Sequence, residues 1–147
     1  MEERFIEPFE TKTLRLVKSE DLNHHGTLFA GRTAEWFVES GFIAAASIID
    51  PKNVVCLKIH GMYFSYPVKP GQVIAFTSKI VYTGKTSLVA YIKVNLKDIG
   101  NSIVDGFVTF VNVDENTKPH AHGIEIVPKT DEDKLLFETA KNMKRKP

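Results

Sequence analysis

Two polar groups within or beside one hydrophobic stretch, residues 21–50, could carry chemistry. The first is the segment 23–27, Asn-His-His-Gly-Thr, which precedes a proline-free apolar run where a helix would begin. The first N–H groups of a helix have no acceptor within it, so they can bind an anion or polarise a carbonyl oxygen. Gly26 would let a ligand approach the backbone closely. A structural interpretation is also open, because Asn23 or Thr27 could cap the helix.

Glu39 is the second group. It follows Arg32 and Glu35 at helical spacing, so the three charges would lie within roughly 60° of one another on one side of a helix. They could form a solvated stripe of ion pairs. Alternatively, Glu39 could face a cleft at a subunit interface, where nearby Trp36 would give a carboxylate the surroundings of a general base.

The other polar motifs predict less. None of the five histidines belongs to a motif with the ligand spacing of a metal site, so we expect no metal. Residues 84–87, Gly-Lys-Thr-Ser, are not a P-loop, because they connect two expected strands and Lys79 stands where the first glycine is required. Such a hairpin could still offer amides, hydroxyls and one cation to a phosphate.

The elements that must position these groups follow from hydrophobic patterning. Residues 28–49 are apolar on nearly every side, which predicts a long helix buried on most of its surface. Acidic residues followed by lysines predict a second helix over 131–143, after a polar connection. Alternating or continuous apolar runs predict strands at 12–18, 54–66, 72–82, 86–97 and 103–113. Short turns between the last four favour an antiparallel meander, and the whole order predicts an α+β fold with one buried helix against the sheet.

Composition narrows the class of protein. A chain of 147 residues fits a single domain, and a formal net charge of +1 gives no support for a nucleic-acid or membrane-surface partner. A single cysteine excludes an intrachain disulfide, and Cys56 in an apolar run is expected to be buried. In the first strand we expect Leu14 and Val17 to contact the core. The acidic N-terminus lacks the apolar core of a signal peptide, so we expect a cytoplasmic protein.

Several motifs in register resemble those of hotdog-fold acyl-CoA thioesterases. The resemblance covers about residues 12–115 and gains specificity from the order of its motifs. They are DLNHHGTLFAG (21–31), WFVE (36–39), AAA (44–46), FSYPVKPG (64–71), GKTS (84–87) and FVTFVNVD (107–114).

The resemblance implies a hotdog domain over 1–147 that hydrolyses acyl-CoA to a carboxylic acid and CoA, without a metal or bound cofactor. In similar proteins an asparagine at the position of Asn23 and an acid at the position of Glu39 serve the reaction, in a site shared by two protomers. That acid is usually an aspartate. We further expect the Gly26 amide to polarise the thioester carbonyl. The residues expected to contact the substrate or its CoA part are His25, Thr27, Gly84, Lys85, Thr86 and Ser87.

Helix geometry gives separate support for a shared site. Glu39 lies about twelve residues past the helix start, roughly 18 Å along the axis, whereas Asn23 precedes the start. Unless the segment 21–26 folds back, one protomer cannot bring both to one thioester, but an antiparallel partner helix can. We therefore predict a homodimer with two equivalent sites, which could assemble further. Two other classes stay open: a different acyl-CoA enzyme such as a dehydratase, and a non-catalytic acyl-CoA-binding or regulatory module.

Overall fold

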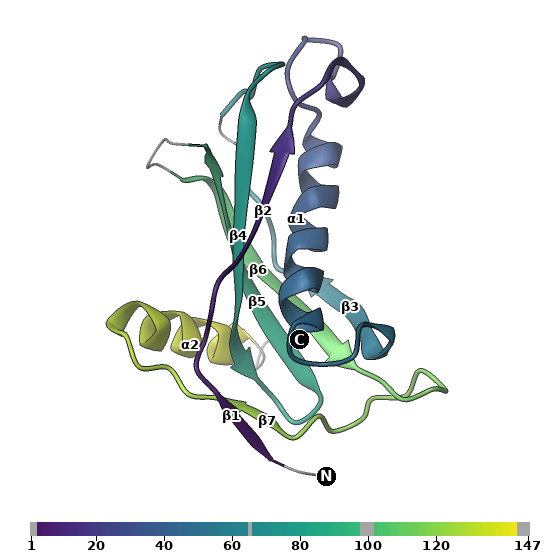
Figure 1. Cartoon of the computed structure of the whole chain (residues 1–147), viewed down its shortest axis with the longest axis vertical. Coiled ribbons are helices and arrows are strands. Elements are labelled where there is room, and N and C mark those ends of the chain that lie inside the picture. The colour runs from purple at the N-terminus through teal and green to yellow at the C-terminus, as the bar shows by residue number, and fades with distance from the viewer. Residues whose placement is uncertain (1–2, 65, 98–101, 144–147) are drawn as a thin grey trace.

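A five-stranded antiparallel sheet lies along a long helix in the computed structural model of the chain (Figure 1). The structure describes residues 3–64, 66–97 and 102–143. The helix is α1 (Ala30–Ala46), and the strand order is β2-β4-β5-β6-β3. The strands are β2 (Thr11–Leu16), β3 (Val54–Ile59), β4 (Val73–Thr83), β5 (Ser87–Leu96) and β6 (Ser102–Asn112). The predicted α+β class, with one central helix against an antiparallel sheet, is confirmed.

The meander predicted from short turns is confirmed for β4, β5 and β6, which are sequential neighbours. The prediction is wrong for β3, which pairs with β6 at one edge and not with β4, while β2 pairs with β4 at the other edge. The turn expected at 98–101 lies outside the described residues. The strand before the helix and the strand after it therefore lie far apart across the sheet.

Helix α1 is shorter than the predicted span 28–49 because other contacts fix the chain at its start. Leu28 is extended, and its N–H donates to the carbonyl of Val68 at 2.7 Å. Phe29 then occupies the N-cap position, and no side chain caps the helix. The interpretation of Asn23 or Thr27 as the helix cap is therefore wrong.

The core lies between α1 and the inner face of the sheet. Phe37, Phe76 and Phe110 are fully buried there. At Gly41 the helix comes so close to the sheet that a Cβ would lie 3.1 Å from Cδ1 of Ile92. A small residue at this point lets the helix lie flat on β5.

Edge strand β2 presents its polar residues to the helix. Thr11 and Arg15 contact groups on the inner side, so Leu14, which points the other way, is 52% exposed. The expectation that Leu14 contacts the core is wrong, whereas Val17 is buried as expected. Leu14 and Val17 are three residues apart, so an alternating strand places them on opposite faces, and the face shared by Thr11, Arg15 and Val17 lies inward.

Edge strand β3 ends earlier than predicted, at Ile59 rather than near residue 66. Apart from its first residue it is exposed, and Cys56 is exposed too, so the prediction of a buried cysteine is wrong. The edge position explains this result, because an edge strand lacks a neighbour on one side. Partial burial nevertheless raises the pKa of the Cys56 thiol.

The second helix, α2 (Asp131–Met143), has the predicted bounds and covers the opposite face of the sheet. Lys79 of β4 donates to the Asp133 carboxylate at 2.6 Å, and the rings of Tyr82 and Phe137 lie 5.1 Å apart. The residues that follow β6 turn back through hydrogen bonds to the Asp114 side chain before they reach β7. No helix in the described part of the chain is long and apolar enough to cross a membrane.

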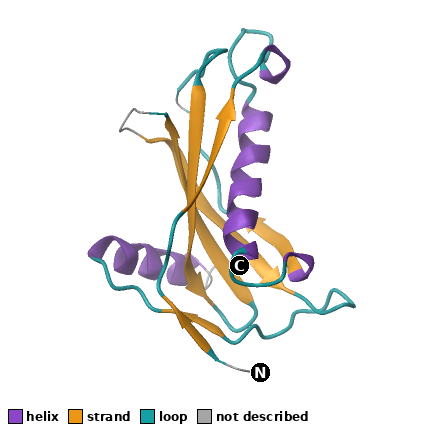
Figure 2. Ribbon diagram, viewed as in Figure 1, coloured by secondary structure: helices purple, strands orange, loops and turns teal. Residues whose placement is uncertain are grey.

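A small parallel pair, β1 (Arg4–Ile6) with β7 (Ile124–Ile126), was not predicted from the sequence. Figure 2 shows this pair beyond the end of the main sheet, near the end of α1. Each strand has only three residues, too few for a recognisable period.

Candidate active site

The segment 23–27 forms a tight loop that the Asn23 side chain holds together. Its Oδ1 accepts the N–H groups of His25 at 2.8 Å and Thr27 at 3.2 Å, and its Nδ2 donates to the Thr27 hydroxyl at 3.1 Å. Gly26 adopts φ +79°, a left-handed conformation that favours glycine, and its N–H donates to the Asn23 carbonyl. Four of the predicted site residues therefore do lie together.

A buried carboxylate ties this loop to the first turn of α1. Asp21 is 4% exposed, and its carbonyl accepts the N–H of Phe29 at 2.9 Å. Its carboxylate lies 3.2 Å from Nε of Arg32, which also pairs with Glu35. In Figure 1 the loop stands beyond the N-terminal end of α1.

The start of α1 offers unpaired donors beside a small apolar pocket. Within the described residues, the N–H groups of Ala30 and Gly31 have no acceptor. A pocket of about 50 Å³, which Ala30 also lines, lies between the helix start, the sheet and residues 64 and 66–68. Phe64 and Tyr66 line it; both belong to the motif at 64–71, but neither was predicted to have a role in the site. The arrangement can bind a carbonyl oxygen next to an apolar substituent.

Glu39 lies farther along α1 and points away from the core. Its side chain is 49% exposed and forms an ion pair with Arg15 of β2. The Arg15 guanidinium lies over the Trp36 ring, 5.3 Å from its centroid. Glu39 therefore pairs with Arg15 and not with Arg32, which pairs with Glu35 instead. Arg15 was missed, although alternation places it on the same strand face as buried Val17.

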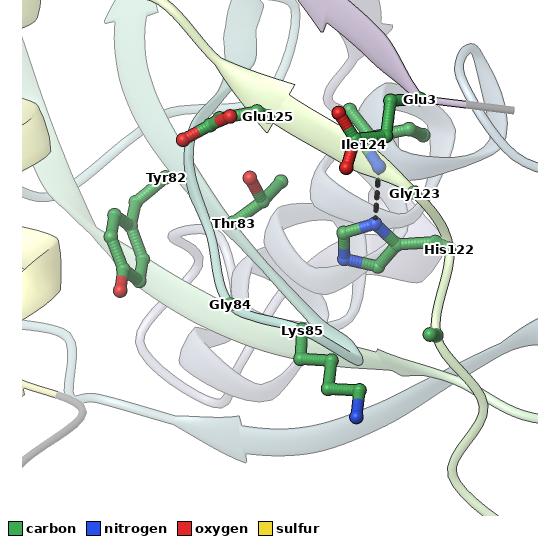
Figure 3. Close-up of a pocket in the computed structure, with 10 residues that line it drawn as sticks. Glu3, Tyr82, Thr83, Gly84, Lys85, His122, Gly123, Ile124 and Glu125 are labelled. Carbon is green, nitrogen blue, oxygen red and sulfur yellow. Dashed lines mark hydrogen bonds between the residues drawn. The ribbon is translucent and has the colours of Figure 1, made fainter.

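The hairpin between β4 and β5 forms a third group of predicted residues. Lys85 and Gly84 line an open cavity of about 570 Å³, with His122 and Glu125 on its other side (Figure 3). The His122 ring accepts the N–H of Ile124 at 2.9 Å, as the dashed line in Figure 3 marks. The hairpin and the helix start lie at opposite ends of β4, a strand of 11 residues that spans roughly 35 Å.

Directly after β3, the side chain of His60 forms a partly buried polar contact that the sequence did not predict. Its Nε2 lies 2.6 Å from the Thr109 hydroxyl. Burial, and then the charge of Lys58, lowers the pKa of His60. Among the described residues, no group of three or more His, Cys, Asp or Glu side chains could hold a metal ion.

Within one protomer, therefore, the predicted residues fall into three separate groups: the loop 23–27, Glu39 with Arg15, and the hairpin 84–87. One protomer does not bring Asn23 and Glu39 together on the same small substrate, because the loop stands beyond the helix start and Glu39 lies nine residues inside it.

Comparison with known proteins identifies relatives of this chain. It is 26% identical to the Bacillus subtilis protein "Uncharacterized acyl-CoA thioester hydrolase YkhA" over 95% of this chain and 82% of that protein. A solved hexameric acyl-CoA thioesterase is 30% identical, with 92% of this chain and 88% of that chain covered and a TM-score of 0.82. An acyl-CoA hydrolase from Staphylococcus aureus, solved with butyryl-CoA and CoA, is 25% identical, with coverages of 90% and 80% and a TM-score of 0.78.

The sheet and helix therefore form a hotdog fold, as the sequence resemblance predicted. The family model that matches residues 25–103 is described as the thioesterase superfamily, and it spans more than half of the chain, from the middle of the 23–27 loop to the beginning of β6. The chain belongs to the thioesterase superfamily.

Proposed function

We propose that this protein hydrolyses acyl-CoA thioesters in a site shared by two protomers. The observation that carries the proposal is the helix start, where the N–H groups of Ala30 and Gly31 have no acceptor among the described residues and Ala30 lines an apolar pocket, in a chain of this family. An oxyanion that forms at the thioester carbonyl needs such preorganised donors. The acyl substituent would lie toward the pocket.

The proposed reaction is a hydrolysis with balanced proton transfers. Glu39 of one protomer takes a proton from water, and the hydroxide attacks the thioester carbonyl carbon. The amides of Ala30 and Gly31 in the other protomer stabilise the oxyanion of the tetrahedral intermediate. The C–S bond then breaks, and the CoA thiolate takes the proton from Glu39. Asn23 holds the loop that borders this site; direct attack by Glu39 through an anhydride is the variant mechanism.

The dimer is supported by the exposed edge of the sheet. Val55, Leu57 and Ile59 on β3 are 44%, 67% and 42% exposed, which is unusual for an apolar edge strand in a soluble monomer. Two-fold pairing at this edge would cover them and place two α1 helices side by side, with opposite directions. The related hexameric thioesterase shows that assembly beyond the dimer occurs in a similar chain.

The CoA part of the substrate would extend toward the hairpin 84–87 of the other protomer, because the hairpin of the same protomer lies at the far end of β4 from the helix start, roughly 35 Å away. Lys85 is the cation beside the open cavity there, although Glu3 and Glu125 line the same cavity. We therefore assign Lys85 to the phosphates and not the cavity as a whole.

A non-catalytic acyl-CoA-binding module is the second candidate function, and a specific observation favours it. The staphylococcal hydrolase was solved as an aspartate-to-alanine and an asparagine-to-alanine variant. In this chain Glu39 lies one residue farther along the sequence from Asn23 than that aspartate lies from that asparagine. The same spacing in this chain leads to Val38, which is not ionisable.

A thiol-release assay across acyl-CoA chain lengths separates the two functions. A thioesterase releases free CoA, the rate is unchanged by a metal chelator, and Glu39→Gln is inactive. A binding module shows saturable acyl-CoA binding by calorimetry with no release. Val38→Asp supplies the sharper test: if it creates activity that Glu39→Gln does not remove, the carboxylate that serves the reaction belongs at position 38 and our assignment of Glu39 is wrong.

A further inference from the structure

Arg15 contacts the proposed catalytic carboxylate, and it comes from a different element. It belongs to edge strand β2, and its guanidinium pairs with Glu39 of α1. The same guanidinium lies 5.3 Å from the centroid of the Trp36 ring, which is 7% exposed. Trp36 and Glu39 are three residues apart on one helix face, so the ring supports the arginine and the arginine supports the carboxylate.

We propose that Arg15 is a positioning residue of the thioesterase reaction, one that fixes the direction of the Glu39 carboxylate toward the site of the partner protomer. The proposal rests on the proposed function. In this proposal each protomer contributes two charged residues, Glu39 and Arg15, to one half of a shared site. The buried Trp36 ring holds Arg15 in place.

Fold stability does not account for the ion pair. The Arg15 and Glu39 side chains are 38% and 49% exposed, and ion pairs of such exposure contribute little to stability. Ordering two long side chains also costs conformational entropy. A planar guanidinium can stack on a ring and grip a carboxylate at once, and a lysine ammonium cannot. The contact is therefore suited to fixing a direction.

The two elements that carry the pair are locked together beside it. Ser40, the residue after Glu39, is 2% exposed, and its carbonyl accepts the Ser78 hydroxyl at 2.8 Å. The Ser78 hydroxyl also lies 2.9 Å from the Thr11 hydroxyl of β2. These contacts join α1, β4 and β2 at one level, so Arg15 and Glu39 keep their relative position before substrate binds. Such preorganisation is what a positioned catalytic group requires.

The first test compares Arg15→Ala and Arg15→Lys with wild type in steady-state thiol release. We expect Arg15→Ala to lower kcat about 10- to 100-fold with KM nearly unchanged, because a misdirected base affects the chemical step. Arg15→Lys should fall between, since it keeps the charge and loses the stacking. Lys52→Ala is the matched control, because it removes an exposed ion pair with Asp50 away from the site. Wild-type kcat in Arg15→Ala, or a loss explained by a lower thermal midpoint, would overturn the proposal.

The second test asks whether Arg15 acts in the half of the site that contains Glu39 of the same chain, or in the half that contains Asn23. When Arg15→Ala is co-refolded with Asn23→Ala, each mixed dimer has one intact site, and activity should rise above that of either variant alone. When it is co-refolded with Glu39→Gln, both sites keep a defect in the same half, and no rise is expected. The opposite pattern would contradict the proposal. Absence of thiol release by the wild type would mean that the proposed function fails. An active Glu39→Gln would mean that Glu39 is not the base, and the role of Arg15 would fail with it. An inactive Glu39→Gln together with a fully active Arg15→Ala would mean that only the role of Arg15 fails.

Discussion

Leu57→Lys should separate the proposed dimer without unfolding the protomer. The side chain is 67% exposed on edge strand β3, and it sits at a bulge opposite β6. Replacing a side chain so exposed changes the stability of one protomer by about 0.5 kcal/mol or less. In a dimer that covers the edge, the loss is larger, because burial of the remaining two thirds of a leucine contributes about 1–2 kcal/mol.

A two-fold interface contains this contact twice, so the substitution should weaken the dimer by about 2–4 kcal/mol, or roughly 30- to 1,000-fold in Kd. Analytical ultracentrifugation over a dilution series measures the shift, and circular dichroism confirms the retained fold. Leu135→Lys is the matched control, because Leu135 is 69% exposed on α2, away from this edge. If Leu57→Lys dissociates no more readily than Leu135→Lys, the β3 edge is not the interface. If it dissociates and remains fully active, the shared site is wrong.

Two further predictions concern charge. Lys85→Ala should raise KM with little change in kcat, because a cation on the hairpin contacts CoA phosphates in the ground state and the transition state alike. The effect should shrink in high salt, which screens exposed charges. A large loss of kcat at constant KM would mean that the CoA part binds elsewhere. The lowered pKa of His60 means that the unfolded chain binds more protons near pH 6, so the free energy of unfolding should fall as pH drops through 6.5 toward the folded-state pKa. Urea titrations above and below pH 6.5 should show this fall in wild type and a flatter dependence in His60→Gln, and equal slopes would contradict it.

Elements with a long, regular pattern could be predicted from the sequence. The alternation over 86–97 gave β5 nearly residue for residue, and the acidic start and basic end of 131–143 gave α2 with its bounds. Helix α1 was predicted two to three residues too long at each end, because apolar Leu28 and Ile49 continue its pattern. The hydrogen bond to Val68 holds Leu28 outside the helix, whereas Ile49 follows the helix end in a turn whose N–H groups still donate to the Ala45 carbonyl. Hydrophobicity alone does not mark such ends.

Edge positions explain most of the errors. An apolar run predicted a buried β3, but this strand lies at an edge of the sheet and Cys56 is exposed. Alternation in β2 was recognised, yet the polar side faces the helix because Arg15 meets Glu39 there, so Leu14 points outward. Which strands lie at the edges depends on how distant segments pair, and this pairing cannot be predicted from a local sequence pattern.

In the candidate site, too, local features were predicted from the sequence and contacts between distant residues were not. The loop 23–27 was recognisable because its residues are adjacent in the chain. The link between Arg15 and Glu39 joins residues 24 positions apart, and only the packing of β2 against α1 brings them together. One interpretation placed Glu39 in a stripe of ion pairs with Arg32 and Glu35, but its ion pair is with Arg15 of β2, which helical spacing could not predict.

The most direct test of the central claim, a site built from two protomers, is co-refolding of Asn23→Ala chains with Glu39→Gln chains. Each variant alone should lose most activity, since loss of a general base typically costs about 10²–10⁴-fold. In a mixed dimer, one site carries both defects and the other carries none. Equal mixing makes about half of the dimers mixed, so roughly a quarter of wild-type activity should return. Mixed dimers that are confirmed by native mass spectrometry and remain as inactive as the parent variants would contradict the shared site.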